Sequence, residues 1–180
     1  MIKVNVKKLI KQADKCLELT QWEEAEKILR QVLKVDQKNP EIYYLLGEAL
    51  CKQERFIESI DTLSKADKLL PNNPRVLHLF GWTHFMNGNS NVGRKLMEKA
   101  HYIFPEDIQI LCDLAVLENK EENYNQALIY INEALKIDPM NEMAKEVLQV
   151  TLYLKESNQN REIKAINNIL RTVVHKIISL

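Results

Sequence analysis

The sequence predicts an all-α solenoid of antiparallel helix pairs, because the same residue pattern returns every 34 positions without a slip in register. Two of the recurring positions hold small residues and a third holds Val or Ala. Proline closes three of the repeats. The recurring residues are Ala13, Gly47, Gly81 and Ala115, then Ala25, Ser59, Gly93 and Ala127, then Val32, Ala66, Ala100 and Ala134, and finally Pro71, Pro105 and Pro139.

The spacing of these residues has a physical reason. A small residue in the first helix of a repeat lets that helix press close to the second, and the small residue in the second helix completes the contact. Larger apolar residues then fill the remaining space, as the ridges of one helix enter the grooves of the next. Each repeat contacts only its neighbours, so such a chain is expected to present an extended binding surface.

These positions resemble the tetratricopeptide-repeat family over about residues 6 to 141. Repeat 2 shows the family pattern most completely, with Tyr43, Leu46, Gly47, Leu50, Phe56, Ser59, Leu63, Ala66 and Pro71. The resemblance implies a right-handed α-solenoid of four repeats, at about 6–39, 40–73, 74–107 and 108–141. Repeat 4 departs from the pattern, since Glu118 stands where the family has tyrosine.

Helix starts are predicted from capping residues in the same register. An Asn or Asp that accepts a backbone N–H suits a helix start, and so does Pro at the first helical position. Asn39–Pro40 and Asn73–Pro74 combine both features, and Asp107 and Asn141 hold the same capping position. Thr20 and Glu23 form a predicted capping box, and Asn123 is expected to cap the second helix of repeat 4. Gly93 lies inside a predicted helix, so the turn at residues 87–91 is expected to be the soft point of the stack.

The C-terminal residues 142–180 are predicted to form a helix pair. One helix is expected to run to about Glu156, Ser157–Asn160 form a polar break, and a last helix runs from about Arg161 to Leu180. Its apolar residues alternate at spacings of three and four, which gives one stripe: Ile163, Ile166, Leu170, Val173 and Ile177. The helix either caps the solenoid or forms a homodimer through this stripe. This segment has no run of about 20 apolar residues, so a membrane span is not predicted.

Composition narrows the classes of function. The 180 residues carry 25 basic and 25 acidic side chains, and this balance argues against a nucleic-acid binder. Residues 1–10 have no apolar segment typical of a secretory signal. Three widely spaced cysteines do not form a disulfide framework. These observations predict a cytoplasmic protein.

No pattern of catalytic or metal-binding residues is present, so the sequence predicts a non-enzymatic protein without cofactor or metal. The four histidines are not part of an HExxH motif or a Cys-x-x-Cys pair. Gly88–Lys95 superficially resembles a phosphate loop, but Arg94 intervenes before Lys95, Leu96 follows it, and the context is helical.

The resemblance also implies a peptide-binding groove, lined by fixed positions of the first helix of each repeat. The implied groove residues are Ile10, Asp14, Leu17, Tyr44, Glu48, Cys51, His78, Trp82, Phe85, Cys112, Val116, Asn119, Val150 and Tyr153. Tyr44, Trp82 and Phe85 are the expected anchors, since aromatic side chains dominate peptide recognition. Asp14 and Glu48 are expected to pair a basic residue of the ligand.

The sequence therefore predicts an adaptor that binds an apolar or aromatic peptide or helix carrying Lys or Arg. Two alternatives remain open: a small chaperone that shields an apolar client segment, similar to those of type III secretion, and a homo-oligomeric scaffold assembled through the C-terminal helix. The family's carboxylate clamp of Lys, Asn and Arg is absent, because its positions hold residues such as Tyr44, Glu48 and Trp82.

Overall fold

The computed structural model describes residues 5–178, with side chains for all of these except residues 162, 165 and 167–178. Over this range the chain is helical with no strand, which confirms the predicted all-α helical repeat. The chain divides into two compact units, one ending at Ile110 and the other beginning at Leu111.

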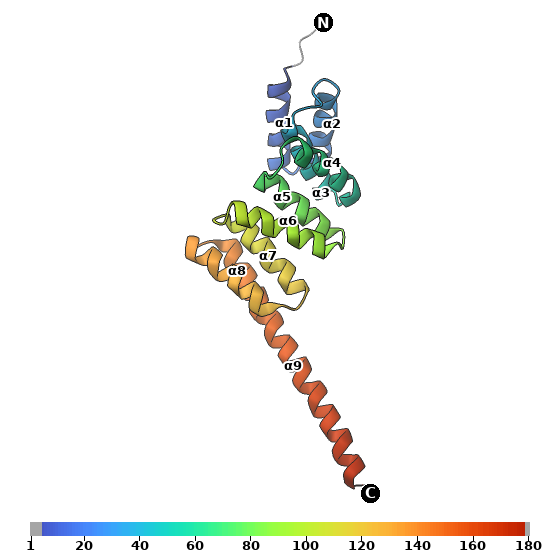
Figure 1. Ribbon diagram of the computed structural model, residues 1–180, viewed down its shortest axis with the longest axis vertical. Helices are drawn as coiled ribbons and strands as arrows, with labels where there is room; N and C mark the ends of the chain where they lie inside the picture. Colours follow the sequence, from blue (N-terminus) through green and yellow to red (C-terminus); the bar gives the residue numbers. More distant parts are fainter. Residues whose placement is uncertain (1–4, 179–180) are drawn as a thin grey trace. The chain divides into compact units, whose positions relative to one another are not determined.

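The first unit contains three complete helix pairs (Figure 1). Each helix packs against the next along the chain, and the first helices of successive pairs, α1 with α3 and α3 with α5, also contact each other. The first helices therefore share one surface. The bounds are α1 Val6–Glu18, α2 Trp22–Leu33, α3 Pro40–Lys52, α4 Phe56–Leu69, α5 Pro74–Met86 and α6 Ser90–Ile103.

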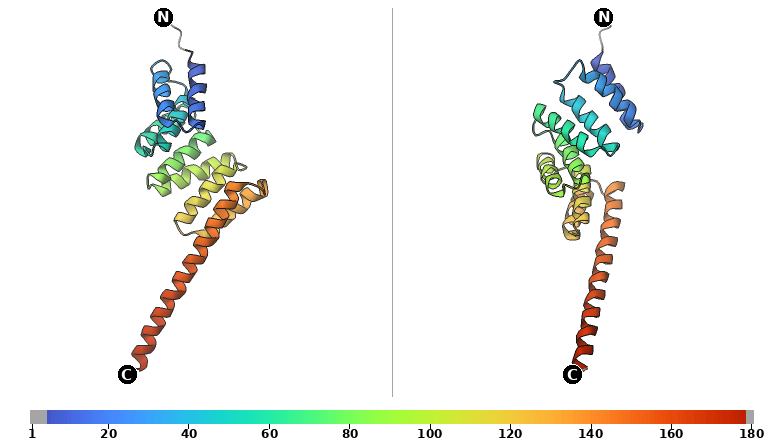
Figure 2. Two further views of the ribbon diagram at one scale, coloured as in Figure 1. Left: turned by 180° about the vertical axis from the view of Figure 1, so that it is seen from behind. Right: turned by 90° about the vertical axis from the view of Figure 1, so that its right-hand side faces the viewer.

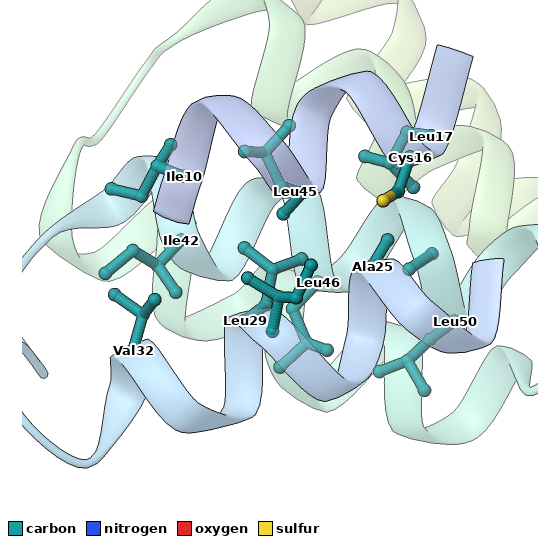
Figure 3. Close-up of a cluster of buried hydrophobic side chains, with 13 residues drawn as sticks. Ile10, Cys16, Leu17, Ala25, Leu29, Val32, Ile42, Leu45, Leu46 and Leu50 are labelled. Atoms are coloured by element: carbon teal, nitrogen blue, oxygen red, sulfur yellow. The ribbon is translucent and has the colours of Figure 1, made fainter. Parts of the chain in front are cut away.

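The repeat positions form the buried core. Ala13, Ala25, Ala66 and Ala100 have no exposed surface, and Ser59, at the same position as Ala25, donates from Oγ to the carbonyl oxygen of Gly47 at 2.7 Å. Figure 3 shows larger apolar side chains of α1, α2 and α3 clustered with Ala25, among them Leu29, Leu46 and Leu50. Burial of this apolar stripe is the main stabilising contribution in helices of this length.

Most of the predicted helix caps are confirmed. Asn39 Oδ1 accepts from the backbone N–H of Glu41, and Asn73 Oδ1 accepts from that of Val76. Asp107 and Asn141 cap their helices in the same way. The capping box at Thr20 is wrong: Thr20 adopts φ 59°, and Gln21 is the residue that precedes α2, without a side-chain cap. The tight turn between α1 and α2 needs a left-handed residue, and Thr20 occupies that position.

Gly93, which precedes no turn but lies inside α6, is at a close contact between the backbones of α5 and α6. A Cβ added at Gly93 would lie 2.7 Å from the carbonyl oxygen of Gly81, and one added at Gly81 would lie 2.8 Å from that of Gly93. The two backbones thus meet without side chains between them. Glycine lowers the helix propensity of α6, but here it permits a contact that no other residue allows.

The second unit contains most of α7 (Ile108–Lys120), together with α8 (Tyr124–Ile137) and α9 (Glu142–Ile178). Buried Ala115, Ala127 and Ile131 form its core, against which Val147 and Leu148 of α9 pack. Asn123 precedes α8 as predicted, but its side chain makes no cap. Its Nδ2 instead donates to Oε2 of the buried Glu118 at 3.0 Å, which gives the unusual Glu118 a structural role in the α7–α8 turn.

The predicted break at Ser157–Asn160 is wrong, because α9 is one continuous helix through this segment. The C-terminal pair is therefore a single helix, whose later turns run beyond the ends of α7 and α8 (Figure 2). Ser, Asn and Gln lower helix propensity by only about 0.7 kcal/mol or less each, and neither Pro nor Gly interrupts the segment. Ser179 and Leu180 lie outside the described residues.

A cluster of charged side chains joins α2 to the start of α4. Arg55 donates from Nη1 to Glu26 Oε2 at 2.6 Å, and from Nε and Nη2 to the two carboxylate oxygens of Glu58 at 2.7 and 2.8 Å. Arg30 Nε and Gln53 Nε2 also donate to Glu26, at 2.8 and 3.0 Å. Several charges in one network hold their geometry better than an isolated surface pair.

Acidification is expected to weaken this cluster. Burial raises the pKa of Glu26, but hydrogen bonds from Gln53, Arg30 and Arg55 outweigh burial, so the pKa lies below its usual 4.5. The stabilisation is therefore present above about pH 4.5 and is lost as the pH falls through the lower folded-state pKa. At neutral pH, Glu26→Gln should reduce the free energy of unfolding by about 0.5–1 kcal/mol.

Urea unfolding across a pH series measures this effect. The difference between wild type and Glu26→Gln should shrink as the pH falls toward about 3, because the wild-type carboxylate is then protonated. Glu98→Gln, on an exposed position of α6, is the matched control and should show no such trend. A difference between wild type and Glu26→Gln that stays constant with pH would contradict the role of the Glu26 charge.

Candidate functional site

The predicted groove residues of the first unit fall into three classes of exposure. Asp14 is exposed, and Tyr44, Glu48, His78 and Trp82 are partly buried. The remaining residues are buried: Ile10, Leu17, Cys51 and Phe85. The buried ones contribute to the core of the unit, so the surface available to a partner is formed by the first two classes.

Phe85 is not the exposed anchor that the sequence predicts, because only 3% of its surface is accessible. A Cβ added at Gly93 would lie 3.0 Å from Phe85 Cβ, which places Phe85 at the α5–α6 contact. Its ring packs against Trp82 with 5.4 Å between the ring centroids. The last turn of α5 thus directs the side chain at position 85 toward α6, where the Phe85 ring packs against Trp82.

Tyr44 is the best-defined aromatic residue of the surface. The Arg75 guanidinium of α5 lies over its ring, 4.8 Å from the centroid, at a distance typical of a cation–π contact. Burial, and after it the Glu48 carboxylate, raises the pKa of Tyr44, against the opposing effect of Arg75. Arg75 was not among the predicted anchors, although its place in the first turn of α5 follows from the same register.

Two carboxylates lie beside Tyr44. Burial raises the pKa of Glu48, and the neighbouring Asp14 of α1 raises it further, while Lys52 and Arg75 act in the opposite direction. The structure therefore brings Asp14 and Glu48 within electrostatic range of each other. The ionised form of Glu48 is incompletely compensated, which favours a further positive charge at this position.

A small cleft opens beside Tyr44. Its volume is about 200 Å³ and it lies between the starts of α3 and α5. Leu70, Val76 and the Tyr44 ring provide its apolar surface. The remaining lining residues are Pro40, Glu41, Asn73 and Arg75. The cleft has room for one apolar side chain, and sequence reasoning missed it because it is formed partly by the α4–α5 loop.

The predicted groove residues of the second unit do not all lie in one cleft. A cleft of about 550 Å³ brings together Val116, Asn119 and Val150, with Lys120, Glu122, Tyr124, Glu146, Val147, Leu154 and Arg161. Cys112 is buried, with 1% of its surface accessible, and is not part of this cleft. Tyr153 is exposed and does not line this cleft; it lines a second one with Ser157 and Asn160.

The site residues offer little for catalysis. Burial raises the pKa of Cys112 to about 11, with a further contribution from Asp113, and burial also raises the pKa of Cys51. Both thiols are thus held in the protonated form, which is a poor nucleophile and metal ligand. Within residues 5–178, no described cluster of three His, Cys, Asp or Glu side chains has metal-binding geometry.

None of the described helices is both long enough and apolar enough to cross a bilayer. The longest, α9, carries many polar and charged residues along its length.

Helix pairs of this geometry, with a shared surface of first helices, define the class of α-helical repeat proteins. Models of the tetratricopeptide repeat match residues 17–81 and residues 108–141. The chain belongs to the tetratricopeptide-repeat family. Its repeats support a role as a scaffold for protein interactions.

Among known proteins, the chain is similar to protein O-mannosyl-transferase TMTC1 of Mus musculus, with 29% identity over 136 residues. That match covers 71% of this chain but only 14% of the mouse protein, so the chain spans a small part of that relative.

Solved structures share the fold at low identity. A thermophilic TPR protein from Thermus thermophilus superposes with a TM-score of 0.77 at 16% identity, covering 84% of each chain. The APC/C hetero-tetramer Cut9–Hcn1 gives a TM-score of 0.75 at 14% identity, covering 80% of this chain and 29% of that one.

Proposed function

We propose that this chain is a non-enzymatic, cytoplasmic adaptor whose first unit binds an apolar or aromatic peptide or helix carrying Lys or Arg. The observation that carries the proposal is the surroundings of Tyr44, which lines a partly apolar cleft and lies within electrostatic range of two carboxylates. The relative named as a mannosyltransferase does not change this proposal, because the chain corresponds to a small part of it.

The cleft beside Tyr44 supports recognition of an apolar side chain. Leu70 is 43% exposed at its edge, and the Tyr44 ring forms part of the wall. The cation–π contact with Arg75 restrains that ring in the absence of a ligand. A side chain that is already ordered loses less conformational entropy on binding, so Tyr44 is suited to act as an anchor.

The carboxylates support recognition of a basic residue next to the apolar one. Lys52 and Arg75 partly offset the charges of Asp14 and Glu48, but the pKa of Glu48 remains raised. Burial destabilises the ionised carboxylate of Glu48, and a ligand ammonium or guanidinium nearby would stabilise it. The proposed ligand therefore places an apolar side chain in the cleft beside Tyr44 and a cation near Glu48.

Peptides selected from a display library test the proposal. The selected peptides should combine an apolar residue with Lys or Arg, and Tyr44→Ala should weaken their binding about thirtyfold. Glu48→Gln should weaken binding about tenfold, and only for peptides that retain the basic residue. Calorimetry on peptide pairs that differ by Lys→Gln measures this coupling.

Glu98→Gln again serves as the matched control and should leave the affinity unchanged. Selection of acidic peptides, or affinity that does not change in Tyr44→Ala, would place the interaction elsewhere. A chaperone role for the same surface would show as a client that becomes soluble only when this chain is present.

A homodimer through α9 is a second candidate, favoured by the exposure of its apolar side chains. Leu152, Ile163 and Ile166 are 50%, 55% and 56% accessible, although such side chains usually pack. Of the predicted dimer residues, the side chains of Leu170, Val173 and Ile177 lie outside the described residues. Sedimentation at several concentrations should show a mass that rises with concentration, and Ile163→Lys with Ile166→Lys should prevent the rise.

A further inference from the structure

The turn between α5 and α6 contains a reactive pair of residues, Asn87 and Gly88. Both are exposed, and Gly88 has φ 84°. A Cβ placed on Gly88 would meet no heavy atom within 4 Å. Asparagine carries a side-chain amide that the backbone nitrogen of the next residue can attack. A glycine at the next residue leaves that nitrogen without steric protection, because glycine has no side chain.

The equivalent turns of the other repeats lack this pair. In repeats 1, 2 and 4 the residues at the same positions are Leu19–Thr20, Gln53–Glu54 and Glu121–Glu122. The second residue of each pair has a positive φ, as Gly88 does. The four turns therefore compare one backbone geometry with and without an asparagine that precedes a glycine.

The folded turn holds the pair in an unreactive geometry. The Gly88 N–H donates to the carbonyl oxygen of Phe85 at 3.0 Å, and the Asn89 N–H donates to that of His84 at 2.8 Å. These two bonds form a Schellman motif at the end of α5. The ψ angle of Asn87 is 8°, so the Gly88 nitrogen lies near the Asn87 nitrogen and away from the Asn87 side chain. The attack therefore requires the turn to open.

Opening of the turn permits a reaction that needs only water. The Gly88 nitrogen loses its proton and attacks Cγ of Asn87, and the new C–N bond closes a cyclic imide. The bond from Cγ to the side-chain nitrogen breaks, and ammonia leaves with the proton that the Gly88 nitrogen has lost. Water then adds to one of the two ring carbonyl carbons and opens the ring. The product at position 87 is aspartate or isoaspartate, and no oxidant or reductant is consumed.

Either product disfavours closure of the turn. A carboxylate at position 87 lies at the C-terminal end of α5, where the helix dipole opposes negative charge. Isoaspartate also adds one carbon to the main chain, which displaces the Gly88 and Asn89 N–H groups from their acceptors. This turn joins α5 to α6, whose backbones meet at Gly81 and Gly93. The modification therefore weakens the helix contact within repeat 3.

We propose that Asn87 is a site of spontaneous deamidation that converts opening of the α5–α6 turn into a permanent loosening of repeat 3. The rate of the reaction follows the fraction of time that the turn is open, because the closed turn is unreactive. This inference does not depend on the proposed peptide ligand, since the turn contributes no residue to the cleft beside Tyr44.

Peptide mapping by mass spectrometry of the full chain, incubated in mildly alkaline buffer, tests the inference. Asn87 should convert faster than Asn91, which is also exposed but precedes Val92. Opening breaks two hydrogen bonds, so Asn87 should convert at least about tenfold more slowly in the folded chain than in the chain unfolded by guanidinium. Conversion of Asn87 no faster than that of Asn91, or equal rates in the folded and unfolded chains, would overturn the inference.

Two variants test the control of the reaction by the turn. Gly93→Ala forces α5 and α6 apart and should speed conversion of Asn87 about tenfold. Leu63→Ala, a destabilising change in the neighbouring repeat, should leave the rate nearly unchanged, because repeats open as separate units. Equal acceleration by both variants would show that unfolding of the whole stack controls the reaction, and would also overturn the inference.

A product mimic keeps the test decisive if Gly93→Ala folds poorly. Asn87→Asp introduces the charge of the product, whereas Asn87→Gln keeps a neutral amide and should abolish conversion at this position. Asn87→Asp should therefore unfold at a lower urea concentration than Asn87→Gln. Equal stability of the two variants would contradict the proposed loosening of repeat 3.

Discussion

Gly93→Ala is expected to lower the free energy of unfolding of the repeat formed by α5 and α6 by about 1–3 kcal/mol, the usual cost of overpacking. Helix propensity alone predicts the opposite sign, since alanine in a helix is favoured over glycine by about 1 kcal/mol. The added Cβ would lie 2.7 Å from the carbonyl oxygen of Gly81. That atom belongs to the backbone of α5, so the two helices must move apart.

The matched control is Gly47→Ala, at the equivalent position to Gly81 in repeat 2. Its added Cβ would come within 2.6 Å of Leu63, but the atoms it meets are side-chain carbons that can rotate. The loss of stability should therefore be smaller than for Gly93→Ala. Urea unfolding of both variants measures the difference. A Gly93→Ala protein that is more stable than wild type would show that α5 and α6 do not approach this closely.

Leu63→Ala is expected to lower the free energy of unfolding by about 2–5 kcal/mol. Leu63 has no exposed surface and fills the space between α4 and the backbone of α3 at Gly47. Truncation removes buried apolar surface and leaves a cavity, and both effects destabilise the fold. Among the variants considered for this chain, this one should have the largest effect on stability.

A double variant tests the reason for that loss. In Gly47→Ala with Leu63→Ala, the new methyl group occupies part of the space that Leu63 vacates, and the clash that Gly47→Ala alone would create is absent. The double variant should therefore be more stable than the sum of the two single effects, by about 0.5–3 kcal/mol. Strict additivity of the two changes would mean that residues 47 and 63 do not share this space.

The candidate site was only partly predictable from the sequence. The register placed Tyr44, Glu48 and Asp14 on neighbouring first helices, and the structure brings these side chains within electrostatic range of one another. The same register did not show that Phe85, which packs against Trp82, is buried while other groove positions are partly exposed. A side chain at the end of a helix can face either the partner helix or the solvent. For Phe85, in the last turn of α5, the packing of α6 against α5 determines that it is buried.

The sequence by itself determined the family, the helix pairs of the four repeats and most of the helix starts, because small residues and caps act within one repeat. Asn73, for example, caps its helix through a backbone N–H only three residues away. Tertiary structure alone decided the interactions between distant residues. Arg75 covers a tyrosine of the preceding repeat, and Asn119 meets Thr151 across 32 positions of sequence. Such contacts depend on how neighbouring helices pack, which no local pattern of residues specifies.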